Sequence, residues 1–155
     1  MRTNVVVALI AVAGMTTPGL AANTLELNCA CTHYVHQIAS YDSYADGRMT
    51  VSTETLPFDE NQCKASNDSV VVDLDASTIT SVSGSGPYSF HAALESSQPA
   101  TISDTRISAS GTRSSNWTID IDRASGRYKF ELRIASAPQF LMSVDGICEK
   151  AEPNR

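Results

Sequence analysis

Two neighbouring stretches of the sequence alternate apolar and polar residues, and this alternation constrains the fold more than any other feature. The stretches are residues 117–122 and 127–134. Successive residues of a β-strand point to opposite faces of the sheet, so a strand buried on one face alternates with a period of two. We therefore predict two strands with one apolar face each, formed by Trp117, Ile119 and Ile121 in the first and by Tyr128, Phe130, Leu132 and Ile134 in the second.

The residues between these strands, 123–126, predict a hairpin, because Gly126 can take the positive φ that a tight turn requires. One register places both apolar sets on the same face and opposite charges across from each other on the other face. A slip by one residue would expose the whole apolar set. The predicted pairs are Ile121 with Tyr128, Ile119 with Phe130, Trp117 with Leu132, Asp122 with Arg127 and Asp120 with Lys129.

The rest of the chain has the composition of an all-β protein. Ser, Thr and Val are frequent, and Gly, Pro, Asn or Asp recur about every 8–12 residues, as in small barrels and sandwiches. We predict an all-β fold, either a single antiparallel β-barrel or a two-sheet sandwich, with disulfides. The predicted strands are residues 25–32, 35–40, 48–55, 69–74, 78–82, 87–94, 101–108, 116–122, 127–134 and 140–144, with a loop at 57–68.

Residues 1–22 have the pattern of a secretory signal peptide. Arg2 provides a positive charge, residues 5–14 are apolar, and Ala21 and Ala22 are small residues suited to cleavage. We expect residues 23–148 to form a single β domain and residues 149–155 to form a C-terminal tail. The mature protein is expected to be periplasmic or secreted.

The chain is acidic, with a formal net charge of −6, and removal of residues 1–22 takes away Arg2 without removing an acid. Nucleic acids and anionic membranes are bound by clustered basic residues that hold phosphates, and the sequence contains no such cluster. The apolar run at 5–14 is too short to span a bilayer, and no other stretch approaches about 18 apolar residues. We therefore expect no nucleic-acid partner and no membrane insertion.

The sequence contains four cysteines, Cys29, Cys31, Cys63 and Cys148. An even number of cysteines in an exported domain favours disulfides, and four cysteines allow three pairings. We favour Cys31 with Cys63, which would fasten the loop at 57–68, and Cys29 with Cys148, which would join the first strand to the last.

A metal site is an alternative use of the same cysteines. Cys29, Cys31 and His33 recur at a spacing of two, so an extended strand would place them on one face, with His36 nearby. Zinc takes Cys and His ligands in tetrahedral sites. Because zinc fingers and knuckles use other spacings, disulfides remain the favoured interpretation, and we expect no metal and no cofactor.

The candidate catalytic residues are weak. The three histidines, His33, His36 and His91, are the side chains suited to proton transfer near neutral pH, but no Gly-x-Ser-x-Gly motif accompanies them. We expect surface or strand-edge histidines and no enzymatic activity.

Two pairs of acids, at 73 and 75 and at 120 and 122, share a strand face each. They could bind calcium or act on a glycosidic bond, but calcium requires six to eight oxygens, usually from a looped chain. We expect them to form a solvated, charge-paired face of the sheet.

Three short motifs resemble a loose family of small exported bacterial proteins. They are Val-Asp-Leu-Asp-Ala-Ser-Thr-Ile-Thr at 72–80, Ile-Asp-Arg-Ala-Ser-Gly at 121–126 and Gly-Ile-Cys at 146–148. The resemblance implies a bacterial, periplasmic or secreted setting and carries over no functional residues.

Two other segments resemble the inhibitory loop of small periplasmic lysozyme inhibitors, which are disulfide-bearing β-barrels with a Ser-Gly-x-x-Tyr motif. Here Ser-Gly-Arg-Tyr at 125–128 and Ser-Gly-Pro-Tyr at 85–88 are each one residue shorter, and the second motif of that family, a Tyr followed by Thr-Lys-Gly, is absent. This resemblance implies an inhibitor of lysozyme or of another hydrolase.

The leading hypothesis for function is an exported, non-enzymatic binding or interaction protein. Its partner would be another protein or a small apolar ligand, since small barrels can hold one ligand in their mouths. A hydrolase inhibitor and a Cys/His metal-binding protein are the alternatives.

Overall fold

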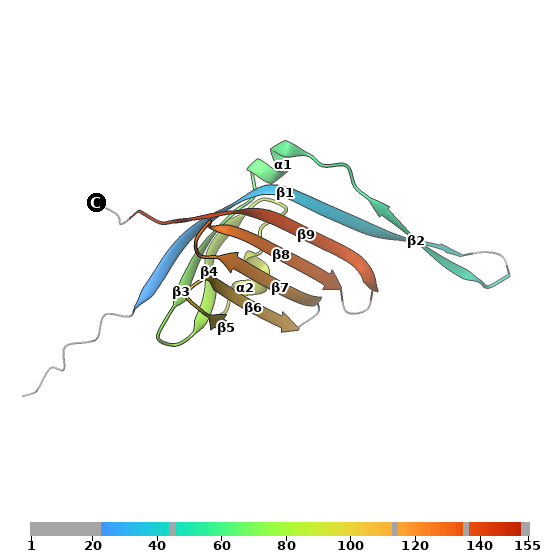
Figure 1. The fold of residues 1–155 in the computed structure, drawn as a ribbon. Coiled ribbons are helices and arrows are strands. Elements are labelled where there is room, and N and C mark those ends of the chain that lie inside the picture. Colours follow the sequence, from blue (N-terminus) through green and yellow to red (C-terminus); the bar gives the residue numbers. More distant parts are fainter. Residues whose placement is uncertain (1–22, 44–45, 113–114, 135–136, 153–155) are drawn as a thin grey trace, which may run out of the picture.

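The computed structural model describes residues 23–43, 46–112, 115–134 and 137–152 (Figure 1). These residues form nine strands and two short helices, and none of the helices is long and apolar enough to cross a membrane. Their bounds are β1 (Thr24–Ser43), β2 (Met49–Thr55), α1 (Glu60–Lys64), β3 (Asn67–Asp73), β4 (Thr78–Ser85), α2 (His91–Leu94), β5 (Gln98–Ile102), β6 (Arg106–Thr112), β7 (Ser115–Asp122), β8 (Arg127–Ile134) and β9 (Ala137–Lys150).

Eight of the strands close into an antiparallel barrel. The order in the sheet is β2-β1-β3-β4-β5-β6-β7-β8-β9, and β1 also pairs with β9. This pairing of the first and last strands joins the two edges of the sheet, while β2 stays outside the barrel as an extra strand on β1. The all-β prediction is confirmed, and the barrel is the architecture that forms.

The strand β1 serves both the barrel and a projecting arm. Its first half pairs with β3 on one side and with β9 on the other, as far as His36. From Gln37 onward it pairs with β2, and Figure 1 shows this two-stranded ribbon running away from the barrel. We call residues 37–43 of β1 together with Met49–Thr55 the β1–β2 arm.

The predicted division of β1 into two strands, 25–32 and 35–40, is wrong. The pairing of β1 with β9 shifts by one residue between Cys31 and His33, and the strand continues past this shift. The strand can remain continuous because β9 pairs with it on both sides of the shift.

The predicted register of the β7–β8 hairpin is confirmed. Ile121 pairs with Tyr128, Ile119 with Phe130, Trp117 with Leu132 and Asp120 with Lys129. Gly126 takes a φ of 72°, as the turn requires.

The charges on the outer face of this hairpin pair differently from the prediction. Asp120 forms its ion pair with Arg106 of β6, with 2.6 Å between Oδ1 and Nη2. Lys129 pairs with Glu131 on its own strand, at 3.1 Å. The carboxylate of Asp122 accepts hydrogen bonds from two backbone N–H groups of the turn that follows it. Neighbouring strands and local turn geometry therefore decide these contacts, in addition to the hairpin register.

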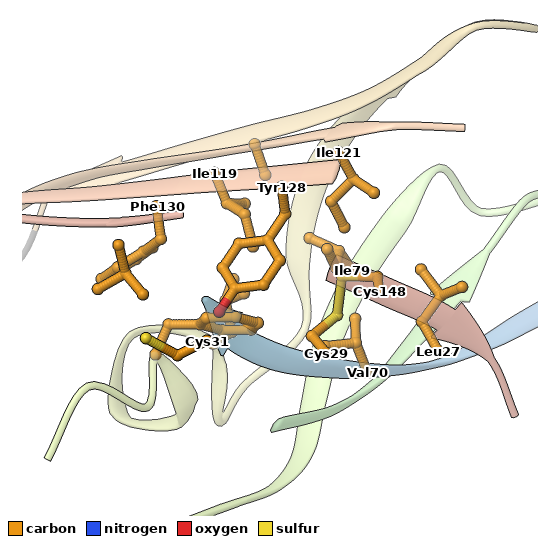
Figure 2. Close-up of a cluster of buried hydrophobic side chains, with 14 of the residues drawn as sticks. Leu27, Cys29, Cys31, Val70, Ile79, Ile119, Ile121, Tyr128, Phe130 and Cys148 are labelled. Atoms are coloured by element: carbon orange, nitrogen blue, oxygen red, sulfur yellow. A yellow bond between two sulfur atoms is a disulfide. The ribbon is translucent and has the colours of Figure 1, made fainter. Parts of the chain in front are cut away.

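Side chains fill the interior of the barrel. Inward-facing residues alternate along each strand, and Figure 2 shows side chains from several strands meeting at the centre. The buried residues labelled there are Leu27, Cys29, Cys31, Val70, Ile79, Ile119, Ile121, Tyr128, Phe130 and Cys148.

Two disulfides reinforce this core. Cys29 of β1 is bonded to Cys148, its direct partner on β9, so the bond lies across the closure of the barrel (Figure 2). Cys31 is bonded to the buried Cys63 of α1. This is the pairing that the sequence favours, and it leaves no free cysteine among the described residues.

The loop predicted at 57–68 contains α1. Asp59 caps the helix by accepting hydrogen bonds from the backbone N–H groups of Asn61 and Gln62, which is the ordinary role of Asp at this position. The disulfide to Cys63 then holds the helix against β1. The prediction that Cys63 fastens this segment is therefore correct, but the prediction of a loop missed the helix.

The strand predicted at 87–94 is wrong. This segment forms a turn followed by α2, because the backbone N–H of Phe90 donates to the Asp68 carboxylate at 3.2 Å and the N–H of Ala93 donates to the carbonyl of Phe90 at 3.0 Å. These bonds occupy backbone donors that a strand would give to its neighbour.

Two further boundaries are corrected. The single strand predicted at 101–108 is divided between β5 and β6 by a turn, in which Ser103 and Arg106 exchange backbone and side-chain hydrogen bonds. At the C-terminal end, the strand predicted at 140–144 is longer, because Glu149 and Lys150 still pair with β1.

Candidate functional site

The helix α2 packs over one end of the barrel, where β7 begins and β8 ends. Phe90, which precedes the helix, and Leu94, its last residue, are both fully buried. Phe90 lies against Phe130 of β8, with 5.5 Å between the ring centroids. The segment is therefore held by apolar contacts with the barrel interior, although the helix itself is only one turn long.

A cavity of about 190 Å³ lies between α2 and the strands β7, β8 and β9. Its lining is mostly apolar and aromatic and includes two serines. An apolar cavity of roughly 150 Å³ accommodates one benzene ring, so this cavity has room for a single ring or a short branched chain. The lining residues are Ser89, Phe90, Ala92, Ala93, Ser115, Trp117, Phe130, Leu132 and Met142.

A buried carboxylate fixes the polar side of the cavity. Asp68 of β3 is only 3% exposed, and its Oδ1 accepts a hydrogen bond of 2.6 Å from the hydroxyl of Ser89. Its Oδ2 accepts the bond from the Phe90 N–H, and the Ser89 oxygen accepts a bond of 3.1 Å from the N–H of His91. Asp68 therefore connects β3 to the segment that leads into α2.

The environment of Asp68 changes its acidity. Burial, which disfavours the charged form, raises the pKa of this carboxyl above its ordinary value. The hydrogen bonds from Ser89 and Phe90 and the proximity of His91 act in the opposite direction without cancelling the effect of burial.

The raised pKa of Asp68 predicts a pH dependence of stability. The folded protein holds this proton more tightly than the unfolded chain, so the contribution of Asp68 is most favourable below its unfolded pKa and is lost as pH rises through its folded pKa. We expect the difference in unfolding free energy between wild type and Asp68→Asn, measured by urea denaturation, to fall as pH rises above the unfolded pKa of about 4.

Asp122 provides a control of opposite sign. Hydrogen bonds from Ser125, together with that from the Ala124 N–H, lower the pKa of this exposed carboxyl. Its contribution is present above the unfolded pKa and lost as pH falls, so the difference between wild type and Asp122→Asn should rise with pH. A rise for Asp68→Asn as well would mean that hydrogen bonding outweighs burial at Asp68.

A second polar contact lies beside the first. The Nδ1 atom of His91 is 3.0 Å from the hydroxyl of Ser81, which is itself buried. In a hydrolytic triad the acid orients the imidazole and the serine can be reached by substrate. Here the Asp68 carboxylate bonds to Ser89 and Phe90 instead, and the arrangement fits an anchor for α2 better than a nucleophile and its base.

The other two histidines lie elsewhere. His33 is exposed on β1, 4.9 Å from the ring of Phe58 between centroids, and His36 faces the edge of Tyr88 at 6.0 Å. The structure therefore does not bring the three histidines together. His33 and His36 lie on a strand as expected, whereas His91 lies on α2.

The acids singled out in the sequence serve local turns and ion pairs. Asp73 accepts hydrogen bonds from the N–H groups of Asp75 and Ala76, as Asp122 does in the next hairpin. Among the residues with described positions, no group of three or more His, Cys, Asp or Glu side chains could hold a metal ion. The two cysteines of the proposed metal set are also bonded to other cysteines, so they cannot act as thiolate ligands.

The tyrosines of the two inhibitor-like motifs are both buried. Tyr88 stacks on Tyr34, with 3.6 Å between ring centroids, and Tyr128 points into the barrel. Burial raises the pKa of both phenols. Neither ring is available to enter the active site of another protein, so the geometry gives the inhibitor hypothesis no support.

The opposite end of the barrel has a wider hollow of about 470 Å³. Its apolar lining includes Leu27, Ile107 and Ile121, but its rim carries Glu149 and Lys150, which have opposite charges. The cavity under α2 differs in having three aromatic side chains in its lining, Phe90, Trp117 and Phe130.

Comparison with known proteins gives no relative: no protein-family model, no curated protein and no solved structure matches this chain. A function therefore has to be inferred from the chemistry of the chain's own residues.

Proposed function

We propose that this chain is an exported, non-enzymatic binding protein that holds a small apolar ligand in the cavity under α2. The observation that carries this proposal is the lining of that cavity, where Phe90, Trp117 and Phe130 come together beneath a helix. Aromatic rings offer large apolar surfaces with defined edge and face geometry, which suits recognition of another ring.

The hydroxyl of Ser89 on the polar side of the cavity indicates which hydrogen-bonding group the ligand should carry. The Ser89 hydroxyl donates to Asp68 and accepts from the His91 N–H. A hydroxyl oxygen has two acceptor lone pairs, so one remains to accept a hydrogen bond. The preferred ligand is therefore a single-ring compound with one donor, such as a phenol.

Export is supported by two observations. Residues 1–22 have the charge and apolar pattern of a signal peptide, and the domain contains two disulfides. Disulfides persist in oxidising compartments and are rare in the cytosol. We therefore assign the protein to the periplasm or the extracellular space.

A fluorescence titration tests the binding site directly, because Trp117 lines the cavity and is the only tryptophan in the sequence. Adding phenol to the oxidised protein is expected to change the fluorescence of Trp117 saturably and to raise Tm with concentration, by mass action. Toluene, which has the ring without the donor, is expected to bind more weakly.

Two matched variants distinguish binding in the cavity from binding elsewhere on the protein. Ala93→Leu places a larger side chain in the cavity and is expected to weaken phenol binding by at least tenfold, about 1.4 kcal/mol. Ala30→Leu makes the same exchange at an exposed position of β1 and should bind like wild type. No saturation in wild type, or equal binding by Ala93→Leu, would contradict the proposal.

A further inference from the structure

The β1–β2 arm leaves one strand with an unpaired edge. All seven residues of β2 are exposed, and within the described part of the chain β2 pairs with β1 alone. An isolated two-stranded ribbon is at best marginally stable in water, whereas sheets of more strands are stable. The arm is therefore an element that would gain stability from a further strand.

The hydrogen bonds of the arm identify the groups on its free edge. The N–H of Leu56 donates to the carbonyl of His36 at 2.8 Å, and this pair continues the register in which Gln37 lies opposite Thr55. Hydrogen-bonded and non-hydrogen-bonded pairs alternate along an antiparallel ladder. The even-numbered residues of β2 therefore bond to β1, and the groups directed outward belong to Met49, Val51, Thr53 and Thr55.

This edge lacks the features that usually prevent association. Natural edge strands are protected by Pro, Lys, bulges or inward-pointing charges. The sequence of β2, Met-Thr-Val-Ser-Thr-Glu-Thr, contains no Pro or Lys and only one charged residue, Glu54. Met49 and Val51 of this strand are 67% and 47% exposed.

We propose that a second copy of this chain pairs with the edge, so that β2 and its symmetry mate lie antiparallel about a twofold axis. The result is a four-stranded sheet in the order β1, β2, β2 of the partner, β1 of the partner. A symmetric dimer requires a surface that is complementary to itself, and a strand edge meets this requirement because its donors and acceptors alternate.

The register of this pairing follows from the outward groups. Outward-directed residues must lie opposite each other, and all seven residues pair only when the axis passes through Ser52. Val51 then faces Thr53 of the other copy, and Glu54 faces Thr50, so no like charges oppose each other. An axis through Glu54 would set two carboxylates face to face, which is unfavourable.

The same register also brings the Val51 side chains of the two copies near each other. Odd-numbered residues of both copies lie on one face of the new sheet, because directly paired residues share a face. Val51 of each copy faces Thr53 and lies diagonally from the other Val51, about 7–8 Å away, so part of the surface that Val51 exposes alone becomes covered. Met49 faces Thr55 of the other copy near the end of the pairing.

Charge substitution at Ser52 tests the dimer and its register together. Ser52→Lys and Ser52→Glu each place like charges opposite one another at the axis, and each is expected to raise the dimer dissociation constant by about fivefold or more. In an equimolar mixture of the two variants, the lysine of one and the glutamate of the other attract each other across the axis, so association should be restored. Native mass spectrometry should then show more than half of the dimers to be heterodimers of the two variants. Thr50→Lys, which faces Glu54 of the other copy, is the matched control and should keep the wild-type dissociation constant or lower it.

Sedimentation velocity of the oxidised protein over a range of concentrations gives the reference value. Because Ser52 and Thr50 are exposed, the variants should keep the circular dichroism of wild type. A wild-type protein that stays monomeric at every concentration would overturn the proposal. So would Ser52→Lys dimerising as strongly as wild type, or a mixture with no preference for the heterodimer.

Discussion

Replacing both Cys29 and Cys148 with alanine is expected to lower the free energy of unfolding by about 4–5 kcal/mol, the largest effect of any change considered for this fold. The bond spans 119 residues in sequence and joins directly paired positions on the first and last strands. Without it, the unfolded chain gains the freedom of that long loop, and closure of the barrel depends on strand pairing and packing alone. Urea denaturation of the oxidised proteins measures the difference.

The second disulfide provides the matched control. Cys31 and Cys63 are separated by 32 residues, and the smaller loop predicts a loss roughly 1 kcal/mol smaller for Cys31→Ala with Cys63→Ala. A larger loss for this pair than for Cys29 and Cys148 would contradict the loop-length explanation. It would show that the docking of α1 contributes more to stability than the closure of the barrel.

Phe130→Ala is expected to destabilise the protein by about 3–5 kcal/mol, the usual range for removing a large aromatic side chain from a packed core. Phe130 is 1% exposed, lies opposite Ile119 and Val144 on the neighbouring strands, and contacts Phe90. Its removal takes away apolar burial and leaves a void that the rigid barrel wall cannot fill. Thermal and urea denaturation should both show Phe130→Ala to be less stable than wild type.

Phe58→Ala provides the comparison for this prediction. Phe58 is 44% exposed and touches the rings of His33 and Tyr34 at the base of the arm. Phe58→Ala should lower the free energy of unfolding by well under half as much as Phe130→Ala. Comparable losses at the two positions would mean that the core tolerates the void, and that the interior is less tightly packed than its burial indicates.

The sequence predicted the register of the β7–β8 hairpin because two independent patterns agreed. Apolar alternation and charge complementarity both selected the register in which Ile119 pairs with Phe130. Local patterns of this kind are sufficient to predict strand register when each residue's environment is determined by the strands next to it. The disulfide pairing was only favoured among the three that four cysteines allow, because the shared face of Cys29 and Cys31 does not decide which partner each one takes. The pairing of Cys29 with Cys148 depends on β1 and β9 being neighbours in the closed barrel.

The sequence could not predict α2 or the cavity beneath it. The helix is a single turn, and its backbone is directed by Asp68, which is distant in the sequence. The cavity gathers Phe90, Trp117 and Met142, which come from three elements and share no spacing. One signal was available: Val70 and Val72 face inward, and the same period of two places Asp68 on the inner face of β3.

The arm was predicted in part. A strand near residues 48–55 was expected, but its position outside the barrel depends on where β1 leaves β9, which is after the pair of His36 with Met142. The position of an edge is a property of the whole sheet. The unpaired groups of β2 therefore become visible only when the order of all the strands is known.

The bond between Cys29 and Cys148 also determines how the domain would respond to mechanical tension. Both ends of the domain lie on the β1–β9 seam, where Lys150 pairs with Leu27, only a short distance beyond this bond. A pulling force applied to the two ends would pass through the sulfur–sulfur link, and the 119-residue span between the cysteines would carry no load. A molecule anchored at one end and stretched from the other would thus lengthen only by its short outer segments, with the cavity under α2 and the arm undisturbed until the bond is reduced.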